Sequence, residues 1–356
     1  IQKSLKDSIL IKIVKKNFNI KGINTNIFLT IFQVISSGLV FFFLYKYLYE
    51  TLGAEKIGLW SLLIGITAIS RVGEVGLTGG VVKFISEAVN SKKQDRASKI
   101  IQTVLISLFF LVSFLIIISY LPAQNILIFA TKQEEILFIK QILPYSFLSI
   151  FLMILIGVLG GSLDGVMLMG LKNFMLGLSH IFYLFLVFKL VPIFGLIGVA
   201  YSQCTQYFIL LILMWVILKR EVKTLPILPF EWDFKVIKDM YSYALNFQAI
   251  SIVAMFFEPL IKIMMSYWGG LTPLGFYEMA NKLIVQSRNI IVESSRIVVP
   301  ITAKNNLKEM NTDVHYEFVK KTINITTFAS FYIFSFLAIS MPIISAVWFN
   351  FINFNF

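Results

Sequence analysis

The chain has 356 residues, of which 58% are apolar and only 14% are charged, against about 25% charged residues in a typical soluble domain. Phenylalanine alone occurs 35 times, and the mean hydropathy is +0.82. This composition excludes an ordinary soluble protein and indicates a polytopic helical membrane protein. A net charge of +12 would suggest a nucleic-acid partner in a soluble chain, so the positions of the basic residues decide its meaning.

Cysteine and histidine are too rare to build a metal centre. The chain has one cysteine, Cys204, and two histidines, His180 and His315, which lie far apart in the sequence. These residues exclude a disulfide framework and a zinc site. We therefore expect no metal and no cofactor, and we interpret His180 as a hydrogen-bonded packing residue.

Nine apolar runs are long enough, at about 20 residues, to cross a bilayer core roughly 30 Å thick as helices. They cover residues 26–49, 57–86, 100–121, 136–161, 174–192, 196–218, 246–268, 275–303 and 322–341. Residues 1–23 precede them with six lysines and no small-residue cleavage pattern. This segment predicts a cytoplasmic amphipathic lead-in rather than a signal peptide.

The basic residues between the runs alternate from one side of the membrane to the other. The lead-in and the loops after spans two, four, six and eight contain most of them, and the other loops contain only Lys46, Lys56, Lys132, Lys140 and Lys189. Cytoplasmic loops carry an excess of lysine and arginine, so the amino end is predicted to be cytoplasmic. The positive charge is then topological, and we expect no nucleic-acid partner.

An internal repeat divides the chain. A shift of 217 residues superposes Gly53 on Gly270, Gly58 on Gly275, Trp60 on Tyr277 and Arg71 on Arg288. Spans one to three and seven to nine then align in the same orientation, as in transporters built from parallel repeats with a site between the halves.

The repeat predicts an all-α, two-lobe membrane fold. Its parts are a lead-in at 1–23, a six-helix lobe at 24–218, a cytoplasmic linker with an interfacial helix at 219–245, and a three-helix part of a second lobe at 246–356. A complete second lobe would need three further spans, so we expect the chain to be a fragment or a truncated product.

Two arginines fall near the middle of predicted spans. Arg71 and Arg288 lie at equal depth in the two halves, and each would destabilise an inserted helix by about 2.5 to 3.5 kcal/mol. One interpretation is a hydrated central cavity in which both arginines receive an anion. The alternative for Arg71 is a structural ion pair with Glu74, three residues on. Arg288 has no carboxylate at a comparable spacing.

Other polar residues accompany Arg288 along the second half. Asn281 and Ser295 lie seven residues on either side of it and form one polar line, which predicts either substrate contact or a hydrogen-bonded helix interface. Two i,i+4 pairs, Glu258 with Lys262 and Glu278 with Lys282, either neutralise each other or take part in cation coupling and substrate contact.

The block LGAEKIGLWSLLIGITAISRVGEVGLTGGVVKFISEA, residues 52–88, resembles the first loop and second span of the O-antigen and capsule repeat-unit flippases. These proteins belong to the multidrug/oligosaccharidyl-lipid/polysaccharide exporter superfamily. The resemblance implies a MATE-like two-lobe transporter in the bacterial cytoplasmic membrane that moves a polyprenyl-pyrophosphate-linked oligosaccharide to the outer leaflet by alternating access. It also implies membrane lipids and a polysaccharide polymerase machinery as partners, with proton or sodium as coupling ion.

The same resemblance places cationic cavity arginines on the second and eighth helices, which Arg71 and Arg288 match. Two other functions remain open. One is a multidrug exporter of the same superfamily, whose site should favour aromatic and acidic side chains. The other, a membrane-embedded polymerase or sugar transferase, lacks a sizeable outside loop with a catalytic constellation, so we do not expect an enzyme.

Overall fold

The computed structural model describes residues 20–70, 77–91, 93–132, 135–296 and 312–349. The regular structure within these ranges is helical, which confirms the all-α prediction. The helices are α2 (Ile20–Thr67), α3 (Leu77–Asn90), α4 (Gln94–Ala130), α5 (Ile136–Gly165), α6 (Met169–Phe194), α7 (Leu196–Glu221), α8 (Phe234–Gly269), α9 (Leu271–Arg296) and α11 (Thr312–Phe349).

Six of the described helical segments are long and apolar enough to cross a membrane. They are Phe28–Ser70, Gln94–Ala130, Ile136–Gly165, Met169–Phe194, Leu196–Glu221 and Ile323–Phe349. Their outward surfaces carry many exposed phenylalanine, isoleucine and leucine side chains, among them Phe28, Phe110 and Phe336. Such surfaces are stable against lipid and not against water, so the chain is a multi-pass membrane protein.

Helix α2 contains the first predicted span and the start of the second. Gly53, inside it, has φ 78° and ψ 167°, so two helical segments meet there at a kink. Gly270, between α8 and α9, has φ 84° and ψ 178°. Both angles lie in the region that glycine tolerates and other residues avoid. The two glycines that the sequence repeat superposes therefore have the same backbone conformation.

The segments that follow these two glycines cross at close range. A Cβ atom on Gly58 would collide with the carbonyl oxygen of Leu271, and one on Gly275 would collide with the carbonyl oxygen of Ala54. Leu271 is the repeat equivalent of Ala54. The repeat therefore relates the two contacts to each other, as at a two-fold interface. Helices α2 and α9 thus approach each other at glycine, as small residues permit in membrane helices.

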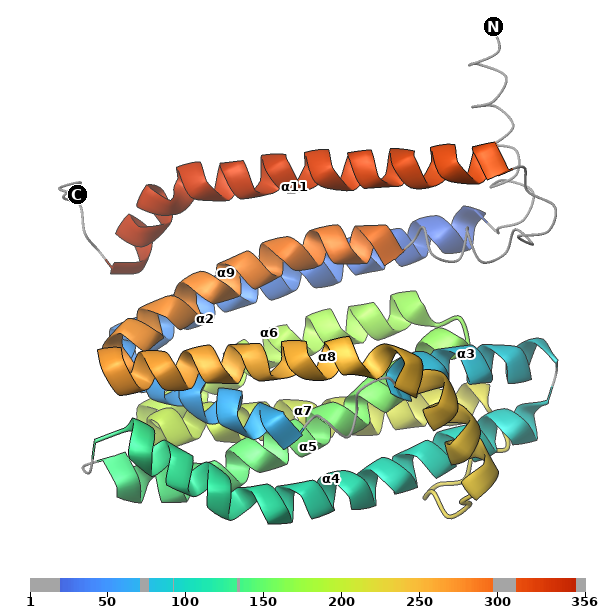
Figure 1. Cartoon of the computed structure of the whole chain (residues 1–356), viewed down its shortest axis with the longest axis horizontal. Helices are drawn as coiled ribbons and strands as arrows, with labels where there is room; N and C mark the ends of the chain where they lie inside the picture. Colours follow the sequence, from blue (N-terminus) through green and yellow to red (C-terminus); the bar gives the residue numbers. More distant parts are fainter. Residues whose placement is uncertain (1–19, 71–76, 92, 133–134, 297–311, 350–356) are drawn as a thin grey trace, which may run out of the picture.

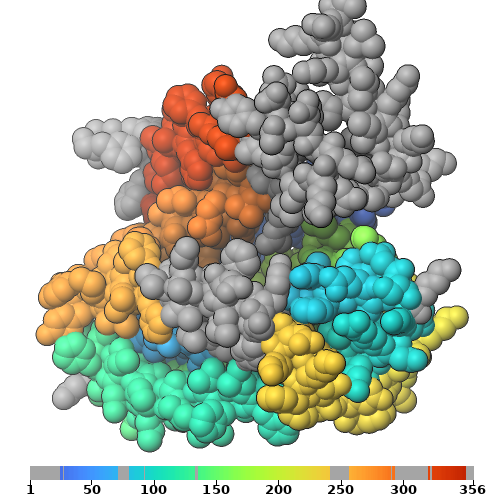
Figure 2. All heavy atoms as spheres, turned by 45° about the vertical axis from the view of Figure 1, so that its right-hand side comes forward, coloured from blue at the N-terminus to red at the C-terminus, as the bar shows by residue number. Residues whose placement is uncertain are grey.

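The remaining helices pack around this crossing. Helices α2 to α7 pack on one another, with α6 against α2 and α7 against both α5 and α6. Helix α9 runs along α2, and α11 lies on the far side of α9 (Figure 1). The space-filling view places the orange region of α8 and α9 between α11 in red and α4 in green (Figure 2).

The turns gather at two opposite ends of the bundle (Figure 1). At one end Lys56 pairs with Glu135 at 2.9 Å, and Ser266 Oγ donates to the carbonyl oxygen of Ala130 at 2.7 Å. These contacts join the Gly53 kink, the α4–α5 turn and the end of α8. The α3–α4 turn and the linker between α7 and α8 lie at the other end, as an up-and-down path requires.

The linker lies against the start of α4. Gln102 is buried, and its side-chain oxygen accepts from the backbone N–H groups of Phe230 and Glu231 at 3.0 and 3.1 Å. Asp233 caps α8 by accepting from the N–H of Lys235, and Lys99 pairs with it at 3.0 Å. The hydrogen bond from Lys99, together with that from the Lys235 N–H, holds the pKa of Asp233 below its usual value.

The segment predicted as an interfacial helix and the span after it belong to one helix, whose first part bends away from the rest (Figure 1), and its place at the membrane interface stays a prediction. Helix α8 already begins at Phe234 and continues without a break into the span that was predicted to begin at residue 246. Asp233 supplies the start signal, because its carboxylate satisfies a backbone donor that the first helical turn leaves without a partner.

The glycine crossing yields a stability prediction. Gly58→Ala and Gly275→Ala should each lower the free energy of unfolding by about 1 to 3 kcal/mol, because the new methyl group has a backbone atom in its place. Gly38→Ala is the matched control, since a Cβ there meets nothing within 4 Å. Thermal unfolding of the detergent-purified protein measures the effect. Equal stability of all three variants would contradict the close crossing.

A labelling experiment tests the orientation in the membrane. Thr272 and Lys223 are exposed and lie at opposite ends of the bundle. In a Cys204→Ser background, Thr272→Cys should react with an impermeant maleimide added outside intact cells, and Lys223→Cys should react only after the cells are opened. The reverse pattern would show that the amino end is not cytoplasmic.

Candidate functional site

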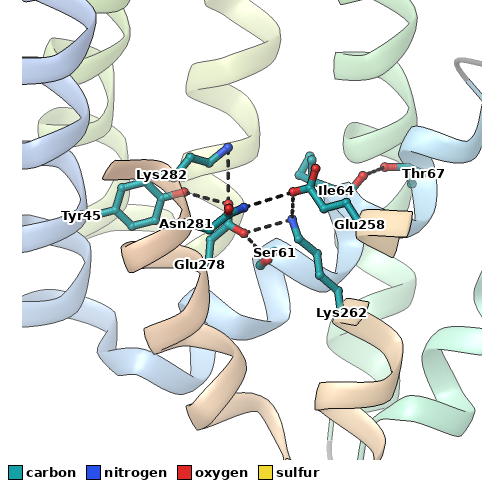
Figure 3. A network of polar contacts seen from close by, with 9 residues as sticks. All are labelled: Tyr45, Ser61, Ile64, Thr67, Glu258, Lys262, Glu278, Asn281 and Lys282. Carbon is teal, nitrogen blue, oxygen red and sulfur yellow. Dashed lines mark hydrogen bonds and ion pairs between the residues drawn. The ribbon is translucent and has the colours of Figure 1, made fainter. Parts of the chain in front are cut away.

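A buried network of charged side chains lies where α8 and α9 meet α2 (Figure 3). Its centre is an ion pair between Lys262 on α8 and Glu278 on α9, with 3.0 Å between Nζ and Oε2. The two side chains are only 3% and 4% exposed. A charge buried to this degree is destabilising by several kcal/mol unless it is paired and hydrogen-bonded, so the partners of this pair define the site.

Glu278 uses both carboxylate oxygens. Oε2 accepts from Ser61 Oγ at 2.6 Å as well as contacting Lys262, and Oε1 lies 3.3 Å from Tyr45 Oη and 3.4 Å from Lys282 Nζ. Tyr45 and Ser61 both come from α2, on either side of the Gly53 kink. One carboxylate therefore links α2 to α9, and it holds two cations and two hydroxyl donors.

The outer part of the network is more open. Glu258 pairs with Lys262 at 3.0 Å and has 54% of its side chain exposed, and Asn281 Nδ2 lies 3.5 Å from Glu258 Oε1. The Lys282 side chain is 34% exposed. The charges of the two carboxylates and the two ammonium groups thus cancel. Lys262 and Glu278 form the buried central pair, and Glu258 and Lys282 are the more exposed carboxylate and ammonium group.

Local sequence explains how these side chains reach one another. Glu258 with Lys262 and Glu278 with Lys282 are one turn apart on their own helices, so each pair shares a face. Gly65 on α2 leaves room for the lysine stem, because a Cβ atom there would lie 2.9 Å from Lys262 Cδ. The contact between Lys262 and Glu278 depends on the packing of α8 against α9.

The predicted site residues do not form one group. Glu258, Lys262, Glu278, Lys282 and Asn281 come together in the network. Arg288 is exposed on α9, ten residues or about 15 Å along the helix from Glu278, and it forms no ion pair with any residue that the structure describes. Arg71 and Glu74 lie outside the described residues, as does the side chain of Ser295.

Two network members, Tyr45 and Ser61, were not singled out from the sequence. A signal for Ser61 exists, because the shift of 217 that superposes Gly58 on Gly275 also superposes Ser61 on Glu278. Residues next to a two-fold axis meet their own equivalents, so the repeat predicts this contact once the glycine crossing is known. Tyr45 lies in the first span, and no pattern of spacing marks it.

His180 and Cys204 each contact a neighbouring helix. His180 Nδ1 and Ser37 Oγ are 2.8 Å apart between α6 and α2, and Cys204 Sγ lies 3.3 Å from the carbonyl oxygen of Tyr145. Within the described part of the chain no three histidine, cysteine or carboxylate side chains are grouped so as to hold a metal ion.

Comparison with known proteins supports a transporter-like architecture. Residues 27–178 match the model of the MatE family, and no curated protein matches the chain by sequence. A solved structure described as the inward-facing conformation of a multidrug resistance MATE family transporter of the MOP superfamily has a TM-score of 0.62 at 17% identity. The alignment covers 90% of this chain and 75% of that one.

Two further solved structures agree. An outward-facing conformation of a multidrug resistance MATE transporter has a TM-score of 0.60 at 19% identity, with 91% of this chain and 73% of the other covered. A MATE in a bent conformation has the same score and identity, with coverage of 92% and 75%. The fold is that of the MATE transporters. The predicted MATE-like fold is thereby confirmed. Sequence identities this low support an inference about the fold but not about function.

The pairing in the MATE-like fold can be tested through stability. Lys262→Met should lower the free energy of unfolding by up to about 3 to 5 kcal/mol, because it removes the buried cation from Glu278 and leaves only the more exposed Lys282, at 3.4 Å, to balance its charge. The double variant Lys262→Met, Glu278→Met should recover much of that loss, since both buried charges are then removed. Denaturation of the purified protein in detergent measures each variant.

Lys46→Met is the control, because Lys46 forms an exposed pair with Glu50 at 3.9 Å. Such a pair contributes about 0 to 1 kcal/mol. A Lys262→Met variant as stable as Lys46→Met would show that the central pair does not form in the folded protein.

Proposed function

We propose that this chain transports an organic solute across the membrane by alternating access, as a multidrug exporter does. The observation that carries the proposal is the two-fold crossing of α2 and α9 with a charged network directly beside it. Ser61 and Glu278 lie three residues, less than one helical turn, beyond Gly58 and Gly275. A site between two repeats of like orientation is the arrangement that transporters use.

The contacts between the two halves support a state closed at the Gly53 end. Phe129 stacks on Tyr267, Tyr49 lies against Phe276 and Phe349, and Trp348 Nε1 donates to the carbonyl oxygen of Phe42. These residues lie toward the same ends of their helices as Gly53 and Gly270. In alternating access, this end would separate when the opposite end closes.

A multidrug exporter accounts for the network better than a cationic cavity does. Aromatic and acidic side chains suit a lipophilic cation, and Glu258, with half its side chain exposed, is an acidic group close enough to Tyr277 to interact with it electrostatically. The network has no excess of positive charge that would attract a pyrophosphate, because its two lysines are paired with carboxylates.

Flipping of a lipid-linked oligosaccharide is the second candidate. The observation in its favour is Arg288, an exposed arginine on α9 whose guanidinium could form a bidentate contact with a phosphate. On this proposal Arg71, Arg288, Asn281 and Ser295 contact the substrate in the bacterial cytoplasmic membrane, beside the polysaccharide polymerase machinery. Both candidates describe a transporter that has its amino end in the cytoplasm and has no enzymatic activity.

Purified protein in liposomes separates the two candidates. A multidrug exporter should move a fluorescent lipophilic cation, whereas a flippase should bring a fluorescent polyprenyl-pyrophosphate saccharide to the outer leaflet. Glu258→Gln should weaken dye transport about tenfold or more, because a charged contact contributes about 1.5 to 3 kcal/mol. Arg288→Gln should weaken flipping by the same physical argument and leave dye transport unchanged.

Arg220→Gln is the matched control, because Arg220 is exposed in the last turn of α7. Flipping that is lost in Arg288→Gln and retained in Arg220→Gln would favour the flippase over the exporter. Movement of neither probe by folded protein would overturn the proposed transport function.

A further inference from the structure

We propose that the linker between α7 and α8 is a binding surface for anionic phospholipid, in the leaflet on its own side of the membrane, which is predicted to be the cytoplasmic one. Its apolar side chains enter the leaflet, and lysines on either side of them contact the headgroup phosphates. This goes beyond the proposed transport function, because it concerns the membrane and not the transported solute, and it holds for either candidate substrate.

The linker lies along α4 and does not extend away from the bundle (Figure 1). Ser98 Oγ donates to the carbonyl oxygen of Thr224 at 3.2 Å. Eight residues further along the linker, Trp232 Nε1 donates to Ser107 Oγ at 2.8 Å. The two serines are separated by about 14 Å along α4. Ser107 belongs to the apolar run 100–121 that is predicted to cross the bilayer, so the linker reaches from the end of α4 to the depth of that span.

The linker exposes large apolar side chains at this depth. They are Ile227, Leu228, Phe230, Trp232 and Phe234, which together we call the apolar linker surface, and each is more than half exposed. In Figure 2 the gold surface of the linker and of the first turns of α8 lies beside the green of α4. A contiguous apolar patch of this kind is unfavourable in water and marks a contact with a partner or with a membrane.

The apolar linker surface continues the lipid-facing surface of the bundle. On α4, Ser107 is followed by the exposed Phe109 and Phe110. On α7, Trp215 Nε1 donates to the carbonyl oxygen of Ile227 at 2.8 Å, and the exposed Val216 comes next. The lipid that covers these positions on α4 and α7 therefore also meets the linker. Tryptophan suits this level of a membrane, because its indole is apolar and its N–H requires a partner.

Exposed basic side chains flank the apolar linker surface. Lys223 precedes it, and Lys235 and Lys238 follow it in the first turns of α8. None of these three lysines forms an ion pair with a residue that the structure describes. An apolar centre with basic flanks is typical of segments that lie in the membrane interface and bind anionic lipids.

The charge around the linker is positive in sum. The start of α4 adds the exposed Lys93 and Arg96, and Lys99 there neutralises Asp233. The other acidic residues of the segments 93–99 and 223–239 are fewer than the basic ones, and they are Asp95, Glu231 and Asp239. Anionic headgroups complement this balance, whereas zwitterionic headgroups supply no net charge.

The test places a bimane fluorophore on Leu228→Cys in the full-length protein with a Cys204→Ser background. Leu228 is 74% exposed, so the label replaces no packed side chain. The vesicles contain equal amounts of phosphatidylcholine and phosphatidylglycerol, and bromine on the acyl chains of one of the two lipids quenches a fluorophore that it contacts. Both lipids should quench the label, phosphatidylglycerol more strongly. Added salt should reduce the difference, because it screens charges that water reaches.

Ser91→Cys is the control for depth, since Ser91 is exposed in the α3–α4 turn at the same end of the bundle. Its label should be quenched by iodide, present on both sides of the membrane, and not by brominated lipid. The Leu228→Cys label should show the opposite pattern.

Lysine variants assign the headgroup preference. Lys235→Gln combined with Lys238→Gln should lower the preference for phosphatidylglycerol by up to about fivefold for each lysine removed. Lys140→Gln combined with Lys189→Gln is the matched control, because it removes the same charge from exposed positions at the Gly53 end. The control should retain the preference in full.

Four results would overturn the proposal. A Leu228→Cys label that iodide quenches and lipid does not would place the linker in water, and a label protected from both would show that protein covers it. Equal quenching by the two lipids would remove the anionic headgroup, as would a preference that the Lys235→Gln, Lys238→Gln variant retains. Each result is independent of the liposome transport assay, so a failure of the proposed function stays distinguishable from a failure here.

Discussion

The ion pair between Lys262 and Glu278 is the contact on which the arrangement of α2, α8 and α9 depends. Each side chain is almost fully buried, and either charge alone would destabilise the fold by several kcal/mol. The neighbouring positions fit this constraint. Gly65 leaves space for the lysine stem, Ser61 donates to the carboxylate, and Gly58 and Gly275 let the two backbones approach. A charged pair therefore fixes a helix interface that lipid alone would not specify.

Much of this arrangement follows from the sequence, but contacts between different helices cannot be predicted from helical periodicity. The shift of 217 residues predicts that Gly53 and Gly270 occupy equivalent turns, and their φ and ψ angles agree. The spacing within α8 and α9 predicts each i,i+4 pair, since neighbours on one helix need no tertiary information. The pairing of Lys262 with Glu278 needs the rotation and height of one helix against another, which helical periodicity does not contain.

The prediction for Arg288 also depended on information that the sequence does not contain. Depth along a span places Arg288 near the middle of the bilayer, but depth does not say which side of the helix faces a partner. In the structure Arg288 is exposed, and Asn281 lies beside Glu258 while Arg288 lies seven residues, or about 10 Å, further along α9. For Arg71 the prediction stays open, because it lies outside the described residues. The finer question of substrate therefore rests on the assays.

The attachment of the linker indicates where α8 has to bend if the halves move. Gln102 and Lys99 hold the linker and Asp233 against α4, so the start of α8 moves with α4. The other end of α8 is joined to α9 through Lys262 and Glu278. Between these attachments, Pro259 lacks the N–H that would complete the helical ladder, and a helix bends most readily at such a residue. Glu258 and Lys262 flank Pro259, so bending there changes their distance from α2 and with it the environment of Glu278.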